Sequence, residues 1–174
     1  FKAILCSPNF IYVEAPQSFG DSTEAIDSEK TRQYALASRL SYFIWSSMPD
    51  RELFEVVEAG ELSDPEILKS QMLRLLKDPK SRAFADHFTD SWLRLNELGS
   101  MPPDTKRFKT YHDRQLEPLM KEETRLFFYE TLSANLDIAT FIDSDVTFLN
   151  RYLADLYGIG GVSGDRLGKV SLPK

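Results

Sequence analysis

Cysteine and histidine are scarce in this chain of 174 residues, and their scarcity excludes several kinds of site. The one cysteine, Cys6, cannot form an internal disulfide, and a cysteine-rich zinc site or a CxxCH haem attachment needs more than one cysteine. The two histidines, His87 and His112, do not have the HxxxH or HExxH spacing of a zinc site. We therefore expect no metal or cofactor site in this sequence.

Positive charge and long apolar runs are scarce as well. The formal net charge is -6, from 21 Lys and Arg against 27 Asp and Glu. Nucleic acids and anionic membrane surfaces attract clustered Lys and Arg, so the charge balance disfavours both as partners. No run approaches the ~20 apolar residues of a membrane-spanning helix. A GxSxG motif is missing too, and we predict no catalytic nucleophile.

The sequence is rich in aromatic residues and in helix signals. Twelve Phe, seven Tyr and two Trp can fill a sizeable core. Cap-and-proline pairs at Asp64-Pro65 and Asp78-Pro79 are typical of helix starts. Apolar residues recur at helical spacing in stretches of about 28–46, 51–59, 65–77, 79–96, 113–133 and 147–157.

These signals predict an all-α fold, an irregular bundle of about six to seven helices. Five of the eight glycines lie between residues 158 and 168, so we expect a Gly-rich C-terminal tail with room for one short strand near residues 169–172. We expect three parts: residues 1–28 as the tail of a preceding domain plus a loop, and helical domains at 29–98 and 99–174 that share a core.

The stretch with the most unusual composition is residues 39–55, which read RLSYFIWSSMPDRELFE. We interpret residues 45–50 as a joint between two helices, in which Trp45 fills the corner and Asp50 caps the helix that follows. Pro49 restricts the backbone of the turn. The alternative is that the joint also lines a pocket, in which case Ser46 and Ser47 would lie beside Trp45 at its wall.

Four polar residues are candidates for structural bonds inside the bundle. Arg39 lies on a helix that looks buried on most sides, so we expect it to pair with a carboxylate such as Glu123, although it could instead anchor an anionic ligand. Asp145 precedes the last predicted helix and is interpreted as part of its cap. Asn150 is expected to point inward and to bond the backbone of a neighbouring loop.

A calcium-binding loop starting at Asp143 is the alternative to the capping interpretation of Asp145. An EF-hand loop needs glycine at its sixth position and glutamate at its twelfth. Phe148 and Ala154 stand at those positions, so the template fails and capping is the better interpretation.

Several long stretches resemble a known family. They read LASRLSYFIWSSMPDRELFE, LSDPEILKSQMLRLLKDPKSRAFADHFTDSWLRL, EETRLFFYETL and DSDVTFLNRYLADLYGI. They resemble a tandem pair of planctomycete domains of unknown function, over roughly residues 30–160. Proteins of that type are typically large and exported, and they commonly carry a cytochrome c-like module.

The resemblance implies a function in outline only. It implies a non-catalytic helical interaction or structural module of a larger protein, periplasmic or exported, with neighbouring domains of the same polypeptide as partners. Haem c is then expected only in the separate cytochrome c-like module. The alternative, which stays open here, is part of an enzyme, polysaccharide-active or redox-linked, with its site at a domain interface.

Overall fold

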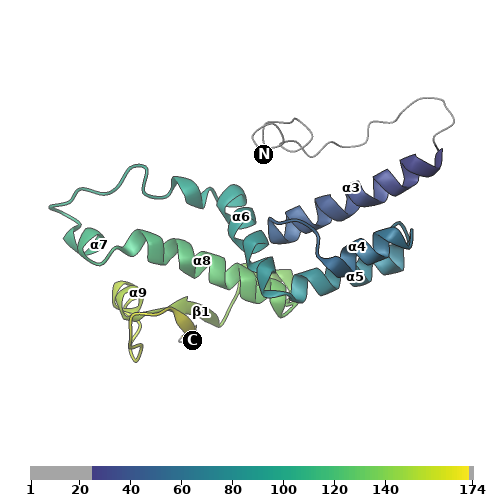
Figure 1. Ribbon diagram of the computed structural model, residues 1–174. Helices are drawn as coiled ribbons and strands as arrows, with labels where there is room; N and C mark the ends of the chain where they lie inside the picture. The colour runs from purple at the N-terminus through teal and green to yellow at the C-terminus, as the bar shows by residue number, and fades with distance from the viewer. Residues whose placement is uncertain (1–24, 173–174) are drawn as a thin grey trace. The chain divides into compact units, whose positions relative to one another are not determined.

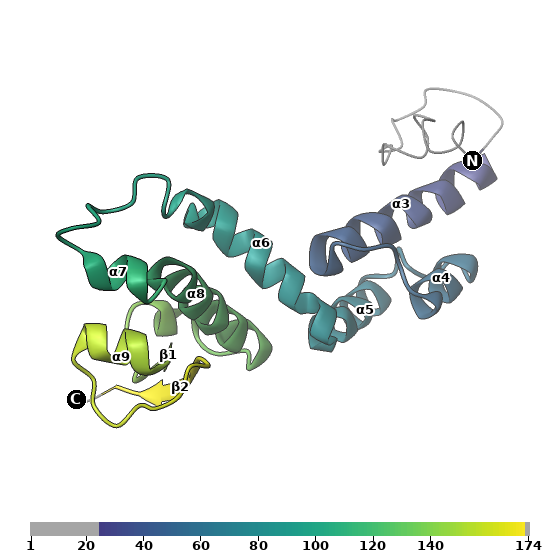
Figure 2. The same ribbon diagram turned by 60° about the vertical axis from the view of Figure 1, so that its left-hand side comes forward.

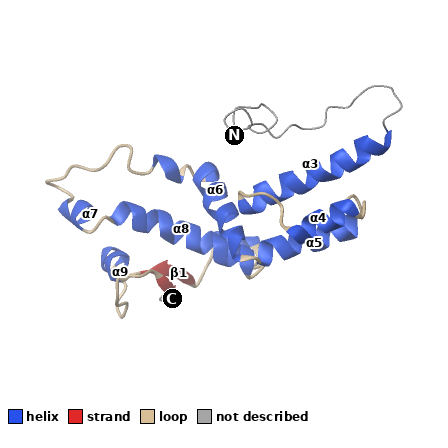
Figure 3. Cartoon of the chain, viewed as in Figure 1, coloured by secondary structure: helices blue, strands red, loops and turns tan. Residues whose placement is uncertain are grey.

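The structure is a computed structural model that describes residues 25–172 of the chain, and it is built mostly of helices (Figures 1 and 3). The all-α prediction is confirmed, because the strands form only one small two-stranded sheet. Contacts between residues divide the chain into two compact units, Phe1–Phe84 (unit 1) and Ala85–Lys174 (unit 2). The predicted domain boundary between residues 98 and 99 stays a prediction.

Unit 1 consists of α3 (Ala25–Trp45), α4 (Arg51–Glu58), α5 (Pro65–Lys77), η1 (Pro79–Ser81) and the first turn of α6 (Arg82–Trp92). Figure 1 shows α4 and α5 lying along α3, and both helices contact it. The buried apolar residues form one cluster: Ala37, Ile44, Trp45, Leu53, Val57, Leu62 and Leu75.

The helix ends of unit 1 follow the cap residues of the sequence. Asp64 accepts hydrogen bonds from the first turn of α5, and Asp78 accepts one from Lys80 in η1. Gly60 follows α4 with φ +76°, a conformation that glycine adopts without strain. Gln33 is a buried polar residue of α3: its amide donates to the Gly60 carbonyl at 2.8 Å and accepts from the Leu62 amide at 3.1 Å.

The prediction that α3 is apolar on most sides and buried is wrong. Tyr42 and Phe43 are exposed, although Phe43 packs against Phe84 with ring centroids 5.0 Å apart. Only the stripe containing Ala37, Ser41 and Ile44 is fully buried, because α4 and α5 contact α3 on that side. A helix of mixed exposure leaves room for a polar residue on its open face.

Unit 2 contains the rest of α6, then η2 (Leu95–Glu97), α7 (Lys109–Asp113), α8 (Leu116–Ser133) and η3 (Ile138–Phe141). Strand β1 (Val146–Leu149), helix α9 (Arg151–Tyr157) and strand β2 (Gly168–Ser171) follow, and Figure 2 shows them gathered beside α8. The strands pair antiparallel, with Val146 opposite Ser171 and Leu149 opposite Gly168. Leu116, Leu149, Leu153 and Ala154 form the buried cluster.

Three predicted helices of unit 2 need correction. Residues 147–149, predicted as the start of the last helix, belong to β1, because the VTFL segment pairs with β2. The helix predicted over 113–133 starts later, because Asp113 ends α7 and Gln115, with φ +49° and no side-chain cap, precedes α8. The stretch 79–96 divides into η1, α6 and the start of η2, with Arg94 at φ +54° after α6. The predicted strand near residues 169–172 is confirmed as β2.

None of the helices among residues 25–172 combines the length and the apolar character that crossing a membrane requires.

Candidate functional site

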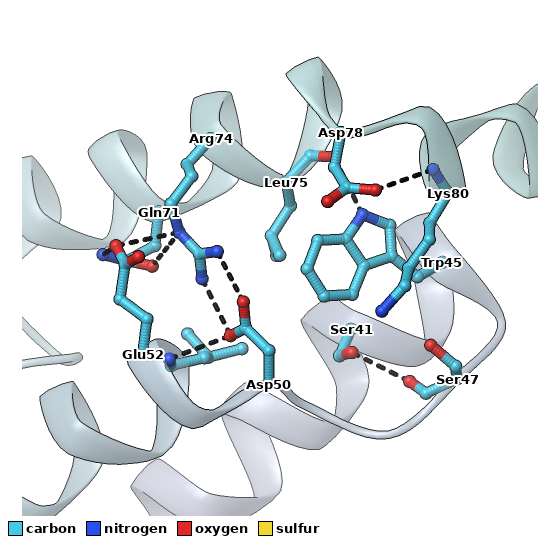
Figure 4. Close-up of polar contacts among 11 residues, drawn as sticks. Ser41, Trp45, Ser47, Asp50, Glu52, Gln71, Arg74, Leu75, Asp78 and Lys80 are labelled. Atoms are coloured by element: carbon cyan, nitrogen blue, oxygen red, sulfur yellow. Dashed lines mark hydrogen bonds and ion pairs between the residues drawn. The ribbon is translucent and has the colours of Figure 1, made fainter.

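The joint, residues 45–50, turns the chain from α3 into α4 (Figure 4). Trp45 is 4% exposed, and its indole N–H donates to the Leu75 carbonyl near the end of α5 at 2.9 Å. Ser46 follows in the left-handed region with φ +53° and ends the helix. Trp45 belongs to the buried cluster that also contains Leu53 of α4 and Leu75 of α5, and its hydrogen bond goes to α5, a partner that the sequence does not predict.

Serine hydroxyls line the inner side of the turn. Ser41 is buried and its hydroxyl donates to the Ser47 carbonyl at 2.8 Å, which ties the last turns of α3 to the chain that leaves it (Figure 4). Ser46 is exposed. Within residues 25–172, the buried hydroxyl oxygens of Ser47 and Ser81 have no hydrogen-bond partner. A pocket at Ser46 and Ser47 stays a hypothesis.

Asp50 has two roles at the end of the joint. Its carboxylate accepts a hydrogen bond from the Leu53 amide at 3.0 Å and so caps α4, as the sequence predicts. The same carboxylate forms a two-point ion pair with Arg74 of α5, at 2.6 Å and 3.0 Å. The hydrogen bond from Arg74 is the largest cause that lowers the pKa of Asp50, and Asp50 in turn raises the pKa of Arg74.

The guanidinium of Arg74 is held on its other side as well. Its Nε donates to Gln71 at 2.8 Å and lies 3.0 Å from Glu52, while Gln71 donates to Glu52 at 3.2 Å (Figure 4). On the opposite side of the joint, the Lys80 ammonium lies 4.5 Å from the centroid of the Trp45 ring. Charged groups from three elements therefore converge on the joint and fix α4 against α5.

Arg39 does not join this network. The sequence predicts a buried guanidinium, but the side chain is exposed on the open face of α3. The burial prediction is wrong because it assumed that α3 is covered on all sides. An exposed arginine needs no buried carboxylate, so the reason for predicting its ion pair no longer holds.

Glu123 connects three elements of unit 2. One carboxylate oxygen accepts from the Thr147 hydroxyl of β1 and the other from the Tyr157 hydroxyl of α9, each at 2.8 Å. Burial, with the hydrogen bond to Glu123 as the next cause, raises the pKa of Tyr157 well above its ordinary value. The tyrosine is therefore neutral and a donor throughout the physiological range.

Asn150 is 1% exposed and forms the turn between β1 and α9. Its side-chain oxygen caps α9 by accepting from the Tyr152 and Leu153 amides, and its NH₂ donates to the Asp165 carbonyl at 3.0 Å. The predicted inward orientation and the bond to a neighbouring loop are confirmed. The cap that the sequence assigns to Asp145 is therefore wrong: Asp145 precedes β1, and its carbonyl accepts from the Leu172 amide at 2.7 Å.

Comparison with known proteins identifies the family. The family model PSD4, described as a protein of unknown function (DUF1592), matches residues 32–159 of the 174. The chain belongs to this family. Neither the curated proteins nor the solved structures contain a match.

The matched span includes the joint, the Glu123 contacts and the Asn150 cap of α9, whereas Asp165, whose carbonyl Asn150 binds, lies beyond it. Sequence reasoning missed Arg74, Gln33 and Tyr157. For Arg74 a signal exists: Gln71 and Arg74 are three residues apart on a helix whose stripe contains Leu68 and Leu75, so they flank the buried face. Among the described residues no group of three or more His, Cys, Asp or Glu could hold a metal ion.

Proposed function

We propose that this member of the DUF1592 family is a non-catalytic helical interaction module of a larger, exported protein. It docks on neighbouring domains of the same polypeptide, among them a cytochrome c-like module that carries the haem. The resemblance of residues 30–160 to planctomycete domains with that arrangement supports the proposal, and family membership agrees with it.

The observation that carries the proposal is the apolar surface of unit 2. The rings of Phe88, Trp92 and Phe141 are partly exposed and contact one another: Phe88 and Trp92 have centroids 5.6 Å apart, and Trp92 meets the edge of Phe141 at 6.1 Å. Ile138 in the same 3-10 helix as Phe141 is 80% exposed. Contiguous apolar surface of this kind is typical of protein interaction sites, and aromatic rings supply much of the affinity there.

The polar candidates support a structural module rather than a catalytic centre. Asp50 and Asn150 each cap a helix and tie it to another segment, and Glu123 holds β1 and α9 to α8. These bonds give each of the three residues a structural role. The chemistry of the larger protein is then expected in its other modules.

Calorimetric titration of this chain with the cytochrome c-like module of the same polypeptide tests the proposal. We expect saturable binding that is weakened at least tenfold by Ile138→Glu, because a buried unpaired carboxylate at an interface is costly. Met101→Glu is the matched control, since Met101 of unit 2 is 91% exposed and the change in charge is the same.

Two results would overturn the proposal. If neither the cytochrome c-like module nor the other domains of the polypeptide bound the chain, no docking role would remain. If Ile138→Glu and Met101→Glu weakened binding equally, the effect would come from charge alone and not from the apolar surface.

A further inference from the structure

A cavity in unit 2 places a carboxylate beside aromatic rings. Its volume is about 340 Å³, at the lower end of the range for small-ligand sites. Residues of α8, of η3 with the segment that follows it, and of β1 line it, among them Glu123, Thr140, Phe141 and Thr147. Ile142 at its wall is 93% exposed, so the cavity reaches the surface.

The carboxylate in this cavity is held by neutral groups. Glu123 accepts from the hydroxyls of Thr147 and Tyr157, one at each oxygen. Hydroxyl donors leave the negative charge in place, and two carboxylate oxygens have about four acceptor positions in all. Acceptor positions on Glu123 are therefore available to a further donor.

Among the residues that the structure describes, three cations on α8 and β2 are paired with other carboxylates. Lys121 lies 2.6 Å from Glu117, Arg125 lies 2.6 Å from Asp90, and Lys169 lies 2.6 Å from Glu130. These pairs fix α8 and β2 without using Glu123. Glu123 is the one carboxylate in the lining of the cavity. Its partners are hydroxyl groups, whereas Glu117 and Glu130 of the same helix have cationic partners.

Aromatic rings stand on another wall of the same cavity. Phe127 and Phe141 line it with ring centroids 6.0 Å apart and an angle of 74° between the ring planes. The faces of aromatic rings carry partial negative charge and attract ammonium groups, while their apolar surface accepts alkyl chains. The net charge of -6 adds long-range attraction for cations.

We propose that this cavity binds an alkylammonium group, with its N–H donors directed at Glu123 and its alkyl stem against Phe127 and Phe141. The ligand is either a free primary amine or the side chain of a lysine from another protein. The proposal does not depend on the docking role above, because a free amine can bind whether or not another domain does.

Titration of the 174-residue chain followed by two-dimensional ¹H–¹⁵N NMR tests the site. The probes are n-butylammonium chloride, n-butanol as the neutral compound of the same shape, and sodium butyrate as the anion. We expect saturable shifts of the Thr140, Ile142 and Thr147 amides with n-butylammonium and at least tenfold weaker binding of the other two. Equal affinity for n-butanol would overturn the proposal.

Substitutions separate the carboxylate from the general charge of the helix. Glu123→Gln keeps the shape and is expected to weaken n-butylammonium binding about tenfold. Glu122→Gln is the matched control on the adjacent residue of α8, which is not among the lining residues, and should change the affinity less than about threefold. Equal losses in the two variants, or no shift with any probe, would overturn the site.

Two further measurements complete the design. If Glu123→Gln does not fold, the comparison of n-butylammonium with n-butanol on the unaltered chain still decides whether the cavity prefers a cation. Glu123→Asp is then the second variant, which tests the carboxylate with its charge retained. Nα-acetyl-lysine methylamide distinguishes the sources: binding tighter than that of n-butylammonium indicates a lysine side chain as the ligand, and weaker binding indicates a free amine. Failure of both amines to bind contradicts the proposal.

Discussion

The joint of unit 1 and the Asn150 turn of unit 2 both start a helix, and both starts also hold a distant segment. Asp50 caps α4 and pairs with Arg74 across 24 positions of sequence, whereas Asn150 caps α9 and donates to the Asp165 carbonyl. One site uses charged groups and the other a neutral amide.

Burial explains the choice. The side chains of Asp50 and Arg74 are about one-third exposed, at 30% and 28%, so water still solvates the pair. Asn150 is almost completely buried, and a carboxylate there would lose its hydration and would lack the NH₂ group that donates to the Asp165 carbonyl. The same capping device is therefore built from an ion pair where water reaches it and from an amide where it does not.

The largest expected effect comes from removing the Trp45 side chain, which is buried between α3 and α5. Trp45→Ala should lower the free energy of unfolding of unit 1 by about 3–5 kcal/mol, because it opens a cavity and removes the indole hydrogen bond to the Leu75 carbonyl. Chemical denaturation followed by circular dichroism measures the change. Trp92→Ala is the control at the other tryptophan, which is half-exposed, and should cost less; equal costs would show that Trp45 does not fill the joint.

The next effect tests the buried neutral cap. Asn150→Ala removes an acceptor for two amides and the donor to Asp165, and should cost about 2–3 kcal/mol. Asp64→Ala is the matched control, because Asp64 also accepts from two amides at the start of α5 but is exposed. That variant should lose about 1 kcal/mol. If the two variants lost the same stability, burial would not explain the difference between the caps.

The ion pair itself is expected to contribute less. A double-mutant cycle with Asp50→Asn and Arg74→Gln should give a coupling energy of about 1 kcal/mol, since the pair is two-point but partly solvated. Asn at position 50 retains the cap, so the cycle isolates the charge interaction. Because the chain has two tryptophans, the cycle is measured in a Trp92→Phe background. The fluorescence of Trp45 then reports the unfolding of unit 1. A coupling energy of zero would assign the joint to packing and capping alone.

The sequence could predict those features of the joint that depend on residues adjacent in the chain. Trp45, Pro49 and Asp50 stand together, so a helix end, a turn and a new cap can be inferred from residue types. The partner of Asp50 could not be inferred, because Arg74 reaches it only when α5 lies beside α4.

The wrong predictions share one physical cause. The burial of Arg39 depended on which faces of α3 its neighbours cover, and the helical prediction from residue 147 onward missed a strand, Val146–Leu149, that exists through pairing with β2. The prediction for Asn150 was correct because a polar residue among apolar ones needs a backbone hydrogen-bond partner, whichever segment supplies it. Tertiary neighbours decide the first two cases, and local chemistry decides the third.

The smallest expected effect is a dependence on pH that only the charged joint should have. Arg74 lowers the pKa of Asp50 below its usual 3.8, so the carboxylate stabilises the fold above the pKa of the unfolded chain and loses that contribution as the pH falls through the folded value. The loss of stability in Arg74→Gln should therefore be full at pH 6 and shrink below about pH 4. The loss in Asn150→Ala should stay constant, because an amide does not titrate. Denaturation of both variants and the unaltered chain at pH 6, 4 and 3 measures these differences. The Arg74 guanidinium also lies 5.9 Å from the centroid of the Trp45 ring, and a constant loss for Arg74→Gln would show that Arg74 acts through this contact rather than through the charge of Asp50.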